Sequence, residues 1–392
     1  MLLYFNPGHE AAVINASPYY MPPANVLRMQ RELAFLPAWY GNPEDYVLLN
    51  CIDDQCYVFF LKNHFSHLPQ CILQETLAAV SDMEVSLWGI SPQAIHFFSE
   101  INRKYGIQLN TPIWSNEYKY LNSRMAAKDC LVEIKNKMPE ISDNIVPVFC
   151  RNIDEIEQVT RMAEQPMLAK APYSSSGRGL LWLSDLSVKE KEFLHGVLKK
   201  QKYVSLEPVL NKDTDFAMQF MCKENGDVEF EGYSLFETNE KGVYVGNYLY
   251  PQEKIINLLA GKISLTLLET AKYTVLLALK EKYAPLYKGC VGVDMMIYKE
   301  NGMYKLHPCL EINMRYNMGY LSMKIQQNYL AGSSNGKFQI EYKAKEGAIY
   351  EKHIEMAKQY PLEIVDGRIE KGYLSLCSVS VQHKYMAYVL VE

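Results

Sequence analysis

The chain has 392 residues, of which 48% are hydrophobic and 22% charged, and its net charge is −5. This length exceeds one ordinary core and indicates two or three subdomains of a soluble globular enzyme. The charge favours neither a nucleic-acid partner nor an acidic membrane, and no apolar run is long enough to span a bilayer. The nine cysteines include no CxxC pair, which predicts reduced thiols in a cytoplasmic protein.

Strands and helices alternate along the first hundred or so residues, which predicts an α/β domain with a parallel sheet. Apolar residues recur at helical spacing in two segments, and short apolar runs between turn residues indicate the strands. The predicted helices are Ala24–Leu36 and Pro92–Tyr105, and the predicted strands are Leu2–Phe5, Tyr46–Leu49, Tyr57–Leu61 and Val85–Trp88.

A second section begins near Thr111 and mixes helices with strands. Ser123 fits the N-cap of a helix that runs to Met138. A strand at Ile145–Phe149, a helix at Asp154–Glu164, two strands within 167–183 and a helix at Val188–Lys200 follow. From Tyr203 the chain is richer in strands, interrupted by a long helix over Ser264–Tyr283.

The stretch "MLAKAPYSSSGRGLLWL" places a loop of small residues between two strands, with Lys170 at its entrance. Backbone amides and hydroxyls of such a loop can surround phosphate oxygens closely, and the lysine ammonium can reach the same phosphates. The pattern is not a P-loop, because a strand follows where a P-loop has a lysine and a helix. A plain hairpin with a serine–glycine tip is the alternative. The candidate loop residues are Ser174, Ser175, Ser176, Gly177 and Gly179.

The stretch "GVDMMIYKENGMYKLHPCLEINMR" reads as two strands joined at Gly302. Glu311 and Asn313 lie two residues apart and therefore face the same side of their strand. If the strands pair, Asp294 joins them, and two carboxylates with an amide oxygen suit Mg²⁺ bound to nucleotide phosphates. Arg315 would lie on the same side if the strand continues. Two exposed hairpin strands with ordinary surface charges are the alternative.

These two blocks, in this order, resemble the ATP-grasp family. "SLEPVLNKDTDFAMQF" is similar to the hinge of that family, and "NSRMAAKDCL" to its helix with the first ATP-contacting lysine. The resemblance covers residues 115–330. It implies an α/β pre-ATP-grasp domain at 1–112, followed by two α+β lobes at 113–202 and at 203–392 with a C-terminal extension.

The resemblance also implies roles for individual residues, with ATP and Mg²⁺ as cofactors. Lys170 and Arg315 would act in catalysis. Asp294, Glu311 and Asn313 would hold the metal. The implied nucleotide contacts are Lys128, Lys170, Ser174, Ser175, Ser176, Gly177, the hinge acid Glu207, the adenine-slot residues Val209 and Leu210, and the ribose partner Asp215, for which Asp213 is an alternative.

A member of this family activates a carboxylate of a small metabolite, amino acid or peptide as an acylphosphate and joins it to an amine. That reaction needs positive charge, which the lysines and Arg315 would supply. It also needs water to be excluded, which the small-residue loop would do. A small-molecule kinase on the same scaffold and a non-catalytic nucleotide-binding protein remain alternatives. Nucleic acid and membrane are not expected as partners, and a homodimer is left open.

Further candidates lie outside these blocks. His9 and Glu10 follow the first strand, where loops of α/β sheets often face ligands, although a plain strand-to-helix turn explains them equally well. His307 and Cys309 form a Cys–His pair without an orienting third group, which makes nucleophilic catalysis the weaker interpretation. Asn317 and Gly319 are candidates for a substrate loop.

Overall fold

The computed structural model describes residues 1–50, 55–174 and 179–392. They form two compact units, and each unit is assembled from separate parts of the chain. Unit 1 comprises residues 1–114, 245–255 and 315–392, and unit 2 comprises residues 115–244 and 256–314. The division into domains at 1–112, 113–202 and 203–392 stays a prediction.

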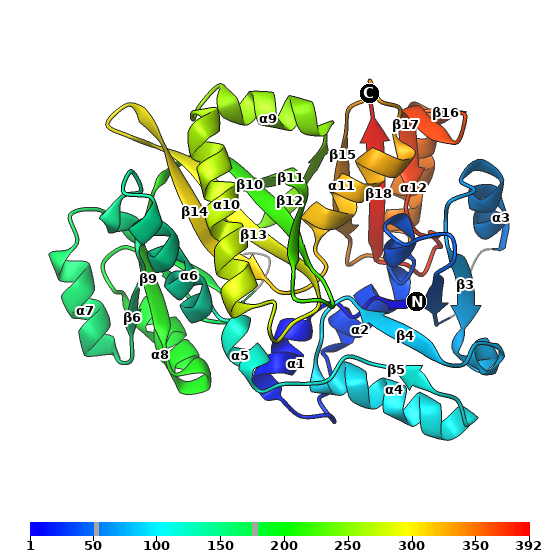
Figure 1. Ribbon diagram of the computed structural model, residues 1–392, viewed down its shortest axis with the longest axis horizontal. Helices are drawn as coiled ribbons and strands as arrows, with labels where there is room; N and C mark the ends of the chain where they lie inside the picture. The colour runs from blue at the N-terminus through cyan, green and yellow to red at the C-terminus, as the bar shows by residue number, and fades with distance from the viewer. Residues whose placement is uncertain (51–54, 175–178) are drawn as a thin grey trace. The chain divides into compact units, whose positions relative to one another are not determined.

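Unit 1 opens with a five-stranded parallel sheet in the order β3-β2-β1-β4-β5, of which Figure 1 labels β3, β4 and β5. Its first strand has a later strand on either side, so the strand order reverses at β1. In open α/β sheets such a reversal is where ligands bind. The strands are β1 (Leu2–Tyr4), β2 (Tyr46–Leu49), β3 (Gln70–Leu73), β4 (Met83–Leu87) and β5 (Leu109–Asn110), and the helices are α1 (His9–Asn15), α2 (Ala24–Glu32), α3 (Gln55–His64) and α4 (Pro92–Tyr105).

The predicted strand at Tyr57–Leu61 is wrong, because this segment lies in helix α3. A strand would have placed Tyr57, Phe59 and Leu61 on one face. Instead Leu61 is buried and Tyr57 packs against the core, while Phe59 is 68% exposed. Tyr57, Phe60 and Leu61 have the i, i+3, i+4 spacing of a helix face, and that periodicity prevails over the β-propensity of the aromatic residues.

The segments 245–255 and 315–392 complete unit 1 with antiparallel strands and helices. The indole of Trp39 donates a hydrogen bond to the carbonyl of Leu376 at 2.8 Å, and its ring contacts Tyr329. One hydrophobic core therefore joins the beginning and the end of the chain. The strands run in the order β12 (Tyr244–Leu249), β15 (Gly336–Tyr342), β18 (Tyr385–Val391), β17 (Arg368–Ser375), β16 (Glu363–Val365), with helices α11 (Met318–Tyr329) and α12 (Ala348–Gln359).

Unit 2 contains a four-stranded antiparallel sheet in the order β6-β9-β7-β8. Helix α8 begins with a capping box, in which Ser187 and Glu190 exchange hydrogen bonds with each other's backbone. The elements are α5 (Glu117–Leu121), α6 (Arg124–Lys137), β6 (Val148–Cys150), α7 (Ile153–Met162), β7 (Met167–Lys170), β8 (Leu180–Leu183), α8 (Val188–Gln201) and β9 (Val204–Pro208).

The second part of unit 2 is an antiparallel run of long strands in the order β14-β13-β10-β11. The turn that joins β10 to β11 contains Gly226, whose φ of 83° favours glycine. The elements are β10 (Asn211–Cys222), β11 (Val228–Thr238), α9 (Gln252–Ala260), whose first four residues belong to unit 1, α10 (Leu265–Lys282), β13 (Gly289–Glu300) and β14 (Met303–Asn313). Among the described residues no helix combines the length and apolar character needed to cross a bilayer.

Candidate functional site

The structure brings the three proposed metal ligands together on strands β13 and β14. Asp294 and Glu311 are directly opposed in the antiparallel ladder, and Asn313 follows Glu311 on the same face. The Asn313 amide donates to an Asp294 carboxylate oxygen at 3.1 Å. No group of three His, Cys, Asp or Glu side chains suited to a metal occurs in the described part of the chain. Two carboxylates and one amide oxygen fit a Mg²⁺ ion that receives its remaining oxygens from phosphate or water.

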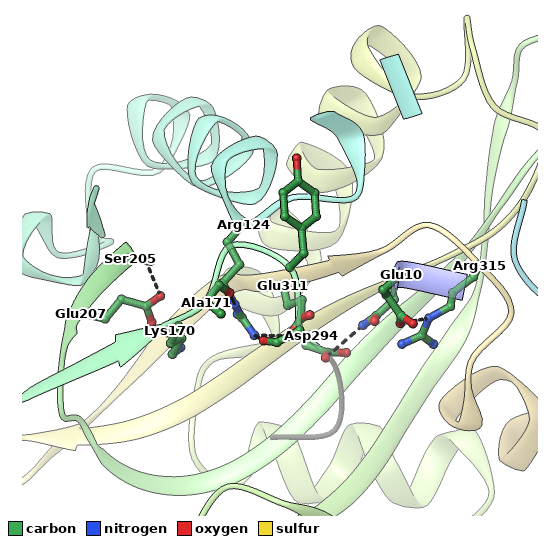
Figure 2. Close-up of polar contacts among 12 residues, drawn as sticks. Glu10, Arg124, Lys170, Ala171, Ser205, Glu207, Asp294, Glu311 and Arg315 are labelled. Carbon is green, nitrogen blue, oxygen red and sulfur yellow. Dashed lines mark hydrogen bonds and ion pairs between the residues drawn. The ribbon is translucent and has the colours of Figure 1, made fainter. Parts of the chain in front are cut away.

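Arg124 connects this carboxylate pair to the small-residue loop (Figure 2). It is the first residue of α6, whose N-cap Ser123 accepts a hydrogen bond from the Ala126 amide. The buried guanidinium lies 3.0 Å from a Glu311 carboxylate oxygen. It also donates to the Ala171 carbonyl at 3.2 Å and to the Ser174 hydroxyl at 3.4 Å. Arg124 therefore brings positive charge between the proposed phosphate loop and the proposed metal ligands.

Lys170 and Glu207 form a buried ion pair between β7 and β9 (Figure 2). Each side chain is only 10% exposed, and the Ser205 hydroxyl donates to the other Glu207 oxygen at 3.2 Å. Burial acts to raise the pKa of Glu207, but Lys170 and then Arg124 outweigh it and lower that pKa. Glu207 is therefore ionised near neutral pH, and Lys170 has a fixed position at the entrance of the loop.

Part of the loop lies outside the described residues, and the candidate residues Ser175, Ser176 and Gly177 belong to that part. At its base the Ala171 amide donates to the Gly179 carbonyl at 2.9 Å, so the two strands stay joined at the loop. A Cβ added to Gly179 would lie 2.5 Å from the Cβ of Ser174. The close approach of Ser174 to the backbone therefore requires glycine at position 179.

The remaining predicted nucleotide contacts lie within unit 2 in different surroundings. Val209 and Leu210 are partly exposed just after β9. Asp215 on β10 already has two partners, the Lys212 ammonium at 2.7 Å and the Thr238 hydroxyl at 2.7 Å. Lys128 is one turn beyond Arg124 on α6, with its ammonium 5.6 Å from the centre of the Phe149 ring. The roles of all these residues stay predictions.

Arg315 would share the face of the metal ligands only if their strand continued, and that condition is not met, because β14 ends at Asn313. Arg315 belongs to unit 1, where its Nε donates to a Glu10 carboxylate oxygen at 2.8 Å (Figure 2). The other Glu10 oxygen lies 3.4 Å from Nδ1 of the buried His9. Although burial acts to raise the pKa of Glu10, Arg315 and His9 hold it well below its ordinary value. The structure thus unites Arg315 with the two candidate residues after β1.

Arg124 is the member of this arrangement that the sequence analysis missed. It stands in the stretch "NSRMAAKDCL", four residues before Lys128, which the family resemblance had selected. The sequence signal that could have identified Arg124 is its position directly after Ser123, the predicted N-cap of the helix. A basic residue in the first turn of a helix is unfavourable for the helix dipole, so its presence there indicates another role.

Comparison with solved structures shows that the chain has the ATP-grasp fold, as the sequence predicted. It is similar to N5-carboxyaminoimidazole synthetase from Staphylococcus aureus complexed with ADP, at 12% identity and a TM-score of 0.51, covering 100% of this chain and 93% of that one. It is similar to another N5-carboxyaminoimidazole ribonucleotide synthetase in its ADP complex at 10% identity and a TM-score of 0.51, over 100% and 92% of the two chains.

The biotin carboxylase–βγ-ATP complex from Campylobacter jejuni is also similar, at 11% identity and a TM-score of 0.50, over 100% of this chain and 87% of that one. No family model matches the sequence, and no curated protein matches it. At these identities the likeness defines the fold, and the function has to be argued from the site.

Proposed function

We propose that the protein is an ATP- and Mg²⁺-dependent ligase that activates a carboxylate of a small metabolite, amino acid or peptide as an acylphosphate and joins it to an amine. The observation that supports this most is the arrangement in unit 2. There Arg124 contacts both Glu311, which is opposed to Asp294, and the carbonyl of Ala171, the residue after Lys170, all within one compact unit. Such an arrangement can neutralise the charge of a triphosphate and hold it in position. Phosphoryl transfer needs this neutralisation and positioning more than it needs a covalent nucleophile.

The chain's own residues divide the work in this proposal. Lys170 and Arg124 bind the phosphates beside Ala171 and Ser174, the residues at the base of the loop that Arg124 contacts. Asp294, Glu311 and Asn313 would hold Mg²⁺, which supplies further positive charge to the phosphate oxygens. Arg315, whose guanidinium Glu10 holds within unit 1, stays the second catalytic residue of the proposal. The solved structures with a similar fold support the assignment to ligases, because two of them are named as synthetases and one as a carboxylase.

The proposed function is tested by ADP release from ATP and Mg²⁺ with pools of small carboxylic acids and of amines, each omitted in turn. A ligase releases ADP at its full rate only when both pools are present, and the product lacks phosphate. A small-molecule kinase would need one pool only and would leave phosphate on the product. ATP binding without ADP release in any combination would contradict both enzymatic functions.

Arg124→Met is expected to weaken ATP binding roughly 10- to 100-fold, because the phosphates lose the charge-assisted hydrogen bonds that the guanidinium donates. Lys128→Met, on the same helix, is expected to have a smaller effect because its ammonium lies over Phe149. Titration calorimetry of both variants with ATP and Mg²⁺ makes the comparison. A larger loss in Lys128→Met than in Arg124→Met would restore Lys128 as the principal contact.

A further inference from the structure

The β11–β12 turn (residues 239–243) packs against the strand that follows the small-residue loop. A Cβ added to Gly242 would lie 2.8 Å from Cδ1 of Leu180 and 3.4 Å from Cη2 of Trp182, both on β8. The first of these distances is too short for two carbon atoms in contact, so the turn reaches β8 because position 242 has no side chain. The turn and β8 both belong to unit 2.

Asn239 holds the β11–β12 turn in one shape. Its backbone amide donates to the Val243 carbonyl at 2.9 Å, and its carbonyl accepts from the Gly242 amide at 2.8 Å. Its side-chain oxygen accepts hydrogen bonds from the Lys241 and Val243 amides, at 2.9 Å and 3.0 Å. Gly242 has a φ of 73°, which favours glycine. The turn is therefore fixed by its own hydrogen bonds where it meets β8.

Leu180 and Trp182 lie on the sheet face that carries Lys170. In the antiparallel ladder Leu180 is directly opposed to Lys170, and Trp182 is opposed to Leu168. Opposed residues share a face, and residues two apart on one strand share it as well. Leu168 is also opposed to Glu207 on β9, so this face carries the buried Lys170–Glu207 ion pair. The β11–β12 turn thus contacts the face that holds the proposed phosphate contact Lys170.

The contact also adjoins the base of the small-residue loop. Leu180 follows Gly179, whose carbonyl accepts a hydrogen bond from the Ala171 amide. Strand β8 is the edge strand in the order β6-β9-β7-β8. An edge strand has a hydrogen-bonded neighbour on one side only, so a packing contact from outside the sheet adds to what holds it in place. A shift of β8 would disturb Lys170 and Ala171, which lie opposite it.

We propose that Gly242 is a positioning residue, through which the β11–β12 turn holds β8 and keeps Lys170 and the base of the small-residue loop aligned for phosphate binding. This inference rests on the proposed nucleotide-binding function. Gly242 acts through Leu180 and Trp182, so it changes the affinity for phosphates without touching them. A change at such a position modulates ligand affinity by a modest factor.

Gly242→Asn tests the contact, because asparagine tolerates the left-handed backbone but brings a side chain against Leu180. Gly226→Asn is the matched control. Gly226 has a φ of 83° in the neighbouring β10–β11 turn, and a Cβ there would meet no atom of the described residues within 4 Å. The two substitutions therefore strain the backbone alike, and only Gly242→Asn pushes against β8.

The experiment measures binding of ATP and of inorganic tripolyphosphate, each with Mg²⁺, to the full chain by calorimetry, together with melting curves. We expect Gly242→Asn to bind both compounds roughly three- to tenfold more weakly, and Gly226→Asn to bind them as the wild type does. The melting temperatures of the two variants should fall by similar amounts, because a purely structural role moves stability without moving affinity.

Two further variants approach the same contact from either side. Gly242→Asn/Leu180→Ala should bind ATP more tightly than Gly242→Asn alone, because the obstructing methyl group is absent. Asn239→Ala loosens the turn without adding a side chain against β8, and should weaken binding of both compounds.

Wild-type affinity for ATP in Gly242→Asn, or in Asn239→Ala should the first variant not fold, would overturn the inference and leave the proposed function intact. Equal losses of affinity in Gly242→Asn and Gly226→Asn would also overturn it, because backbone strain would then be the cause. A loss for ATP without one for tripolyphosphate would contradict a role at the phosphates. Absence of ATP binding by the wild type would overturn the proposed function and this inference with it.

Discussion

Replacing Glu311 by glutamine is expected to lower the rate of Mg²⁺-dependent ADP release by about 10²- to 10³-fold. The amide has nearly the same shape as the carboxylate but lacks its charge, and hard cations such as Mg²⁺ prefer carboxylate oxygens. The substitution also removes the charged partner of Arg124, whose guanidinium lies 3.0 Å from Glu311. ADP release measured over a range of Mg²⁺ concentrations should show a lower maximal rate together with a higher Mg²⁺ requirement.

The matched control is Glu229→Gln, since Glu229 lies in the same unit in a surface ion pair with Lys223 and its side chain is 58% exposed. That variant should retain both the wild-type rate and the wild-type Mg²⁺ requirement, as surface pairs contribute little. Melting curves establish that Glu311→Gln is folded. A folded Glu311→Gln protein with full activity and an unchanged Mg²⁺ requirement would remove Glu311 from the proposed metal site.

Lys170→Met is expected to lower the free energy of unfolding by about 3–5 kcal/mol, because it leaves the buried Glu207 carboxylate without its cation. The double variant Lys170→Met/Glu207→Gln should regain most of that loss, since no uncompensated charge remains. Neither variant should bind ATP with wild-type affinity, because both lack the ammonium at the loop entrance. Denaturant unfolding and calorimetry with ATP separate the two effects. A double variant that is stable and binds ATP normally would show that Lys170 has only a structural role.

Acid unfolding gives an independent measure of the same ion pair. The folded-state pKa of Glu207 is below its ordinary value of 4.5, so the unfolded chain binds this proton at a higher pH than the folded chain. The stabilisation is therefore complete above pH 4.5 and is lost as the pH falls through the folded-state pKa. Below pH 4.5 the stability of the wild type should fall more steeply with pH than that of the double variant.

The sequence allowed the ATP-grasp fold to be predicted because its signals are local and ordered. One signal is a lysine directly before a small-residue loop. Another is the "CLEIN" strand, in which the spacing of the residues determines which side chains share a face. Arg124 could not be assigned in this way, because its importance depends on Ala171 and Glu311, which are distant in the chain. The pairing of Arg315 with Glu10, 305 residues earlier, likewise has no local signal. At α3 the aromatic residues suited either structure, and tertiary packing decided for a helix.

The interleaved path of the chain constrains how the molecule can be made. Strand β18, the last in the sequence, pairs with β15 and β17 and contributes to the core that contains Trp39. During synthesis, unit 1 therefore lacks part of its interior until the ribosome has translated residue 391, whereas every residue of unit 2 has been made by residue 314. A nascent chain halted between these points would expose apolar surface of unit 1, and would depend on chaperones until translation is complete.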